Sequence, residues 1–166
     1  MNSLMKPALF ESHKLRVISL LITSVAILGW CIPSQAHWEY TGVADPQTKQ
    51  LLRIATSKSL TWEGVLMVRL SPEGGANIVL GTKGAIICAD PCTVRIAFDG
   101  KDGGMREARY PGSIKNMLYL SPRETTLNMI KSSKKIEVEI KTLDFGWRVM
   151  QFDTANFDLD HLIRVQ

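Results

Sequence analysis

The chain lacks the motifs from which catalytic and cofactor sites are usually built. Its 166 residues include three histidines and three cysteines. It contains no glycine-rich loop of the kind that holds phosphate and no zinc-binding motif. No group of residues forms a catalytic constellation in the sequence either. We therefore expect a protein that is not an enzyme and that needs no cofactor.

The chain also lacks an apolar run long enough to cross a membrane comfortably. Its longest run, VISLLITSVAILGWCI at residues 17–32, falls short of the roughly 20 residues that a spanning helix needs. Basic residues precede this run, and Ser34 and Ala36 follow it as the small residues that a signal peptidase requires. This order predicts a cleaved signal peptide at residues 1–36 and a mature form without a stable membrane span. An uncleaved anchor and a lipoprotein acylated on Cys31 are the alternatives.

A strong charge of either sign is absent once the leader is removed. The leader takes three of the 20 basic residues and one of the 16 acidic ones, which leaves 17 and 15 in residues 37–166 and a net charge of about +2. Physiological salt screens so small an excess, so we expect no nucleic-acid partner. The mature chain is long enough for a single domain with one core. We expect it in the periplasm, with secretion as a further possibility.

Cleavage would leave two cysteines, Cys88 and Cys92 of the stretch CADPC. A zinc site would need two further ligands, and the mature chain offers only His37 and His161, one at each end. A thioredoxin-like motif spaces its cysteines two apart at the start of a helix, and CADPC does neither. Because an oxidising compartment pairs such thiols, we predict a structural Cys88–Cys92 disulfide. The flanking alternation places it across the mouth of a hairpin that turns at residues 89–91.

Alternating apolar and polar residues recur along the mature chain and predict strands. In the run 135–141, Ile136, Val138 and Ile140 alternate with charged side chains. The same period of two marks five further runs, at residues 38–44, 50–57, 65–70, 76–80 and 92–98. The run 147–153 is apolar on both faces, which favours a central strand. Short strands at such intervals predict a mainly β fold, an antiparallel sandwich or barrel.

One short helix should interrupt the strands. Ser121 suits the N-cap, Pro122 suits the first helical position, and Glu124 would complete a capping box. The helix should therefore run from Pro122 to about Lys131, and the tail after residue 152 favours a second helical turn. The helical residues expected to face the sheet are Leu127 and Ile130.

Five side chains are candidates for contact with a partner: Arg95, Arg106, Arg109, Tyr110 and Lys115. Lys101 and Tyr119 stand near them in the sequence. Such a group suits an acidic or aromatic-rich partner. The alternative is a solvated sheet face whose charge is balanced by Asp99 and Glu107.

Two other stretches have competing interpretations. Residues 99–104, Asp-Gly-Lys-Asp-Gly-Gly, resemble a calcium loop but lack the glutamate at its far end. Because Asp-Gly is a strong hairpin signal, the sequence favours a turn and no metal. The stretch Phe145-Gly146-Trp147 favours packing in the core or in a hairpin turn over a platform for a ligand.

The order of these features is similar to that of a known group of proteins. The features that carry the likeness are Trp38, the turn at residues 45–49, Val-Arg-Leu at 68–70, Phe-Asp at 98–99, a leucine-bearing helix before KKIEVEI, and Phe152 in a following strand. Over about residues 38–158 the chain resembles small exported proteobacterial proteins of the VasI type, which accompany type VI secretion systems, and the invasion-associated locus B proteins. The resemblance implies a β-rich periplasmic accessory protein without catalytic activity. It transfers no functional residue.

Two functions fit these expectations. The first is a periplasmic binding or accessory protein that serves a secretion or conjugation apparatus, with another envelope protein as its partner. The second is an inhibitor or immunity protein that blocks a cell-wall hydrolase or a toxin. Neighbouring genes would distinguish the two, because a secretion cluster favours the first and an adjacent hydrolase or toxin gene favours the second.

The leader generates a prediction about processing. We expect cleavage after Ala36, because the basic start, the apolar run and the small residues before this position match a signal peptide. The intact mass of the exported protein should correspond to a chain that begins at His37. A mature species that keeps Met1, or one with a lipid on Cys31, would contradict this prediction.

Overall fold

The computed structural model describes residues 37–45, 48–72, 75–89 and 91–166. The predicted signal peptide lies outside these described residues, so its cleavage stays a prediction. The described residues, from His37 to Gln166, belong to one compact unit. All of the buried core described below belongs to this unit.

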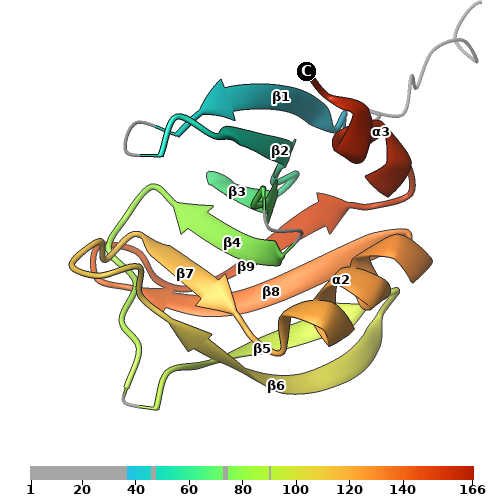
Figure 1. Ribbon diagram of the computed structural model, residues 1–166. Helices are drawn as coiled ribbons and strands as arrows, with labels where there is room; N and C mark the ends of the chain where they lie inside the picture. Colours follow the sequence, from blue (N-terminus) through green and yellow to red (C-terminus); the bar gives the residue numbers. More distant parts are fainter. Residues whose placement is uncertain (1–36, 46–47, 73–74, 90) are drawn as a thin grey trace, which may run out of the picture. The chain divides into compact units, whose positions relative to one another are not determined.

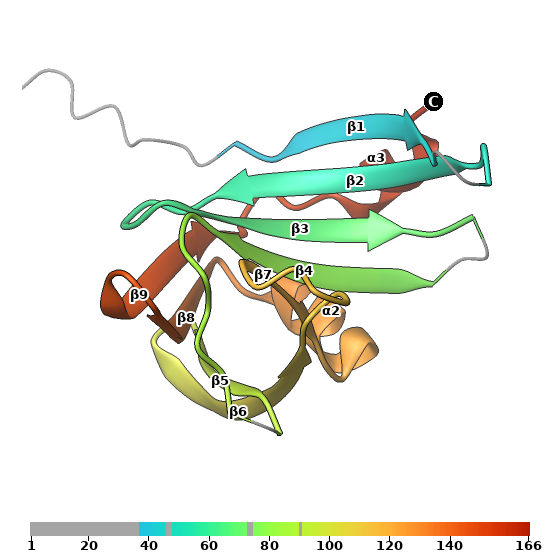
Figure 2. The same cartoon turned by 90° about the vertical axis from the view of Figure 1, so that its left-hand side faces the viewer.

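The unit is built on one bent antiparallel sheet (Figure 1). Its nine strands are β1 (Glu39–Ala44), β2 (Leu51–Lys58), β3 (Gly64–Leu70), β4 (Ala76–Thr82), β5 (Thr93–Phe98), β6 (Lys101–Arg109), β7 (Met117–Leu120), β8 (Lys135–Thr142) and β9 (Gly146–Asp153). They pair in the order β1-β2-β3-β4-β7-β6-β5-β8-β9. The first four strands form one layer, and β5, β6, β8 and β9 curve round to face it (Figures 1 and 2). The prediction of a mainly β antiparallel fold is confirmed. Strand pairing does not close the sheet, because β1 and β9 are its two ends.

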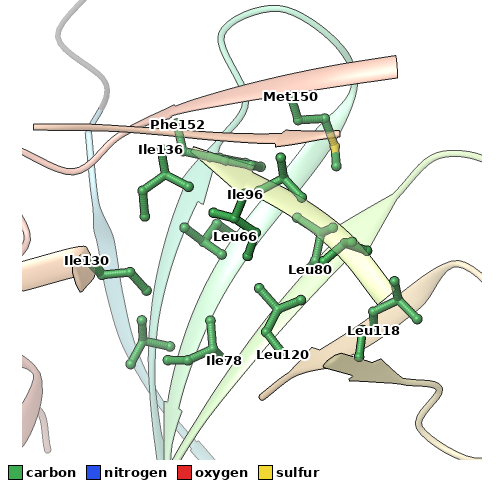
Figure 3. Close-up of a cluster of buried hydrophobic side chains, with 14 of the residues drawn as sticks. Leu66, Ile78, Leu80, Ile96, Leu118, Leu120, Ile130, Ile136, Met150 and Phe152 are labelled. Carbon is green, nitrogen blue, oxygen red and sulfur yellow. The ribbon is translucent and has the colours of Figure 1, made fainter. Parts of the chain in front are cut away.

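The core lies between the two facing halves of the sheet. Leu66 and Leu80 from one half are 1% and 0% exposed, and Ile96 and Phe152 from the other are 1% and 0% exposed. Figure 3 shows these side chains pointing toward one another. They occupy alternate positions of their strands, as the period of two predicts. Burying one such side chain contributes about 1.5–3 kcal/mol, so this contact stabilises the fold strongly.

The position of β9 differs from the prediction of a central strand. It is the last strand of the sheet, and Trp147 and Val149 on its outer face are 62% and 46% exposed. Its free edge is covered in part by the β2–β3 connection, where the Leu60 N–H donates to the Gln151 carbonyl over 2.8 Å. The Thr61 hydroxyl donates to the Val149 carbonyl over 2.8 Å. The prediction failed because apolar residues on both faces of a strand indicate burial only when something packs on both faces.

Two helices complete the unit, α2 (Arg123–Ser132) and α3 (Leu159–Arg164). The predicted bounds of α2 hold within one residue, and Ile130 reaches the core with 0% exposure. The capping box is wrong, since α2 has no side-chain cap and Pro122 takes the N-cap position. The Ser121 N–H instead donates to the Glu107 carbonyl of β6 over 2.8 Å, directly after the end of β7.

Helix α3 confirms the helical turn expected in the tail. The Asp158 side chain accepts a hydrogen bond from the His161 N–H over 2.9 Å and so caps the helix. The Tyr40 ring of β1 packs against His161, with centroids 4.6 Å apart. Its hydroxyl accepts a hydrogen bond from the Asp158 N–H over 2.7 Å. Partial burial raises the pKa of Tyr40.

The predicted Cys88–Cys92 disulfide is present, with the two Cα atoms 5.0 Å apart. The predicted hairpin around it is not formed. The segment before Cys88 pairs instead with the end of β8, where the Ile87 N–H donates to the Lys141 carbonyl over 2.7 Å. Strand β5 pairs with β6 and β8. The disulfide therefore fastens the connection from β4 to β5. The hairpin prediction failed because alternation along a chain does not reveal which strand lies beside a segment.

This arrangement generates a prediction about stability. Replacing both cysteines by alanine should lower the free energy of unfolding by about 2 kcal/mol, because the bond closes only a short loop of the unfolded chain. The variant should still fold, since the core does not depend on the bond. Denaturant melts of the two proteins, with thiol labelling of the native one, measure this. Thr93→Ala, an exposed position next to Cys92, is the control. Two free thiols in the native protein, or an unchanged midpoint, would refute the prediction.

Candidate functional site

The structure separates the five side chains that were candidates for partner contact. Arg95 lies on β5 and pairs with Asp102 of β6 over 2.8 Å. The hydrogen bond from Arg95 lowers the pKa of the Asp102 carboxyl. Arg106 turns instead toward α2, with one guanidinium nitrogen 3.5 Å from the sulfur of Met129. Its Nε atom is buried without a hydrogen-bond partner. Arg95 and Arg106 thus lie in two different environments and form no common surface.

The other three candidates lie near one another at one end of the unit. The Arg109 guanidinium stands 5.8 Å from the ring centre of Tyr119. The Tyr110 hydroxyl donates to the Ile86 carbonyl over 2.6 Å. The Lys115 ammonium lies 4.2 Å from the ring centre of Tyr110. These contacts position side chains at the ends of β6 and β7, next to the connection that carries the disulfide.

The stretch that resembles a calcium loop is a hairpin turn, as the sequence favours. Asp99 and Gly100 form the two-residue link between β5 and β6, with φ angles of 50° and 75°. Both values suit the turn type that Asp-Gly prefers. The Asp99 carboxylate accepts hydrogen bonds from the N–H groups of Lys134 and Lys135 over 2.8 and 2.9 Å. Within the described ranges, no three His, Cys, Asp or Glu side chains gather as a metal site. Asp99 therefore fastens the start of β8 to the hairpin.

Four connections meet at the same end of the unit. The strand register shows this, because Gly64 pairs with Thr82, Gly81 pairs with Met117, and Ile86 bridges Thr142. The connections are those between β2 and β3, β4 and β5, β6 and β7, and β8 and β9. In Figure 2 the first and the last of them lie side by side at the left. Their contact is direct, since the rings of Trp62 and Phe145 are 5.6 Å apart.

This end carries most of the exposed apolar surface of the described residues. Six of the ten most exposed large apolar side chains lie there: Leu60, Ile87, Ile114, Leu143, Phe145 and Trp147. Their exposed fractions run from 37% for Phe145 to 67% for Leu143. We term these six residues the loop-end surface. Large apolar side chains that gather at one end of a domain mark a candidate binding site.

A pocket of about 660 Å³ opens beside the loop-end surface. Its walls combine the aromatic rings of Trp62 and Phe145 with the ion pair between Lys83 and Glu63, whose atoms are 2.7 Å apart. The other lining residues are Lys58, Ser59, Leu60, Thr61, Gly64 and Val65. The pocket is therefore apolar on one side and charged on the other.

The stretch Phe145-Gly146-Trp147 only partly follows the prediction of internal packing. Phe145 packs in the turn against Trp62, and Gly146 has the positive φ of 68° that the turn requires. Trp147 is 62% exposed and packs in no core, so the packing interpretation is wrong for this residue. Isolated apolar residues on loops have no periodicity, and this is why the sequence reasoning missed the loop-end surface. The available signal was that five of the six large apolar residues, all but Trp147, lie outside the predicted strands.

Comparison with protein families, with curated proteins and with solved structures finds no match to this chain. The resemblance to VasI-type and invasion-associated locus B proteins therefore stays a prediction. Among the described residues, no helix has the length and apolar character that crossing a membrane would require.

The contacts of Asp99 generate a prediction. Asp99→Gly should lower the free energy of unfolding by about 2 kcal/mol, because two backbone N–H groups lose a charged acceptor while the positive φ is still accommodated. Asp99→Asn should retain most of the stability, since its side-chain oxygen can accept the same bonds. Urea melts with and without calcium measure both effects. Stabilisation of the native protein by calcium that Asp99→Gly abolishes would restore the calcium interpretation.

Proposed function

We propose that this chain is an exported, non-catalytic accessory protein that docks on another component of the cell envelope. The observation that carries the proposal is the loop-end surface, which gathers large apolar side chains from four connections at one end. Exposed apolar area in water is unfavourable, and binding removes it. Docking is therefore the function that this geometry supports best.

The loop-end surface is held in place by the fold, which favours binding. The Ile86 N–H donates to the Lys115 carbonyl over 2.8 Å. The Leu143 N–H donates to the Ala85 carbonyl over 2.8 Å. These bonds join three of the four connections, so little order has to be imposed when a partner binds. Binding residues on loops that a rigid scaffold positions are common in proteins.

The expected context is a secretion or conjugation apparatus of the cell envelope. This part of the proposal rests on the predicted signal peptide and on the resemblance to VasI-type proteins. An inhibitor or immunity protein would use the same exposed end to block its target. The identity of what is captured decides between the two.

A retention experiment tests the docking role. Residues 37–166, which contain the whole described core, should sediment with an envelope fraction. Leu143→Ser/Trp147→Ser should reduce retention by about tenfold or more, because anchor residues of this kind dominate binding. The control is Met105→Ser/Ile163→Ser, at positions 60% and 51% exposed outside the loop-end surface.

Equal retention of both double variants would contradict a docking role for the loop-end surface. Thermal melts ensure that all variants are folded. Mass spectrometry of cross-linked material identifies any protein partner. A captured hydrolase or toxin would support the inhibitor role over the accessory role.

A further inference from the structure

We propose that the loop-end surface docks on an anionic lipid surface. This inference rests on the proposed docking function and names its target. Three features of the described residues support it. The exposed apolar side chains come from separate connections, basic side chains lie near them in the sequence, and the turns at the opposite end of the unit carry fewer exposed apolar residues.

The apolar side chains come from separate connections. Leu60 belongs to the β2–β3 connection, Ile87 to the β4–β5 connection and Ile114 to the β6–β7 connection. Leu143 follows β8 and Trp147 stands at the start of β9. Each connection thus contributes one or a few apolar groups at a single end, which together can enter the boundary between headgroups and acyl chains. Tryptophan is the residue that favours this boundary, and Trp147 is 62% exposed.

Basic side chains stand between these apolar groups. Lys115, Lys141 and Arg148 lie on the same connections or directly beside them. In the part of the chain that the structure describes, no carboxylate forms an ion pair with any of the three. Lys83 and Lys58 are neutralised by Glu63 and Glu39, at 2.7 and 3.3 Å.

The local charge therefore favours an anionic target. In the sequence the four connections carry three acidic residues, which are Glu63, paired with Lys83, and Asp90 and Asp144. Lys115, Lys141 and Arg148 against the latter two leave an excess of one positive charge. Long basic side chains can lay their apolar stems along the surface while their charges reach the headgroups.

The same composition disfavours a protein target. The centre of a protein interface is depleted of lysine, because a desolvated ammonium needs a partner. At the loop-end surface, Lys141 pairs in register with Trp147, so a cation stands beside the most apolar group. A lipid interface accommodates both neighbours, since the ring enters the boundary and the ammonium stays among phosphates.

The opposite end of the unit provides a contrast. It contains the β5–β6 turn, where Lys101 follows Asp99 and Gly100. None of the ten most exposed large apolar residues among the described ones lies in that turn or in the described part of the β3–β4 connection. Basic charge without apolar groups would not hold a protein on a membrane. We therefore expect the protein to bind lipid through the loop-end surface and not through the opposite end.

Vesicle binding tests the inference with residues 37–166. Vesicles of phosphatidylcholine and phosphatidylglycerol in equal parts should sediment the protein, whereas phosphatidylcholine alone should bind it weakly. The emission of tryptophan should shift to the blue on binding. Trp38 is 2% exposed and already buried, so the shift should come from Trp147 and the partly buried Trp62, and its reduction in the variant that lacks Trp147 identifies the share of that residue. Added salt should weaken binding, since part of the attraction is electrostatic.

Variants separate the apolar and the charged contributions. Leu143→Ser/Trp147→Ser should reduce binding to anionic vesicles by about tenfold or more, and Met105→Ser/Ile163→Ser should leave it unchanged. Lys141→Gln should weaken it about fivefold, which corresponds to about 1 kcal/mol for one basic residue at an anionic surface. Lys101→Gln, at the opposite end, should have no such effect.

The outcomes distinguish this inference from the docking function on which it rests. Binding that depends on Trp147 and Lys141 supports the lipid target. Absent vesicle binding, with envelope retention that still depends on Leu143 and Trp147, would overturn the lipid target and leave a protein partner as the target of the same surface. Equal binding to neutral and anionic vesicles would overturn the charge argument. Vesicle binding and envelope retention that the loop-end variants both leave unchanged would overturn both proposals.

Discussion

The apolar contact between the two halves of the bent sheet is the interaction on which the rest of the structure depends. Leu66 and Leu80 meet Ile96 and Phe152 across the core, and each of them is at most 1% exposed. This contact fixes how far the sheet bends, and the bend brings connections far apart in the sequence to one end. Without it, the ends of β2, β4, β6 and β8 would have no common position.

Single polar contacts then fasten the connections to this scaffold. Asp99 ties the β5–β6 turn to the start of β8 through two backbone N–H groups. The disulfide holds the connection from β4 to β5. Thr61 takes the place of a neighbouring strand at the edge of β9. Each device adds little energy compared with the core, but each decides where a loop lies. The loop-end surface owes its form to such devices together with the bend.

Local patterns in the sequence predicted the local elements well. The strands of the alternating runs followed from side-chain period, because period depends only on which face a residue occupies. The bounds of α2 followed from the residues expected at its start. The same reasoning misplaced the partners of those elements. Ser121 has the right chemistry for a helix cap, yet its N–H serves the sheet. The segment before Cys88 has the right parity for a hairpin with β5, yet it pairs with β8.

The sequence by itself determined the class of fold, the faces of the strands, the Asp-Gly turn and the pairing of the two cysteines. These features depend on residues that are close in the chain, and their chemistry acts over a short range. Tertiary structure alone decided the order of the strands, the edge position of β9 and the separation of Arg95 and Arg106 from Arg109. It also assembled the loop-end surface, because residues as distant as Trp62 and Phe145 become neighbours only when the sheet bends around its core.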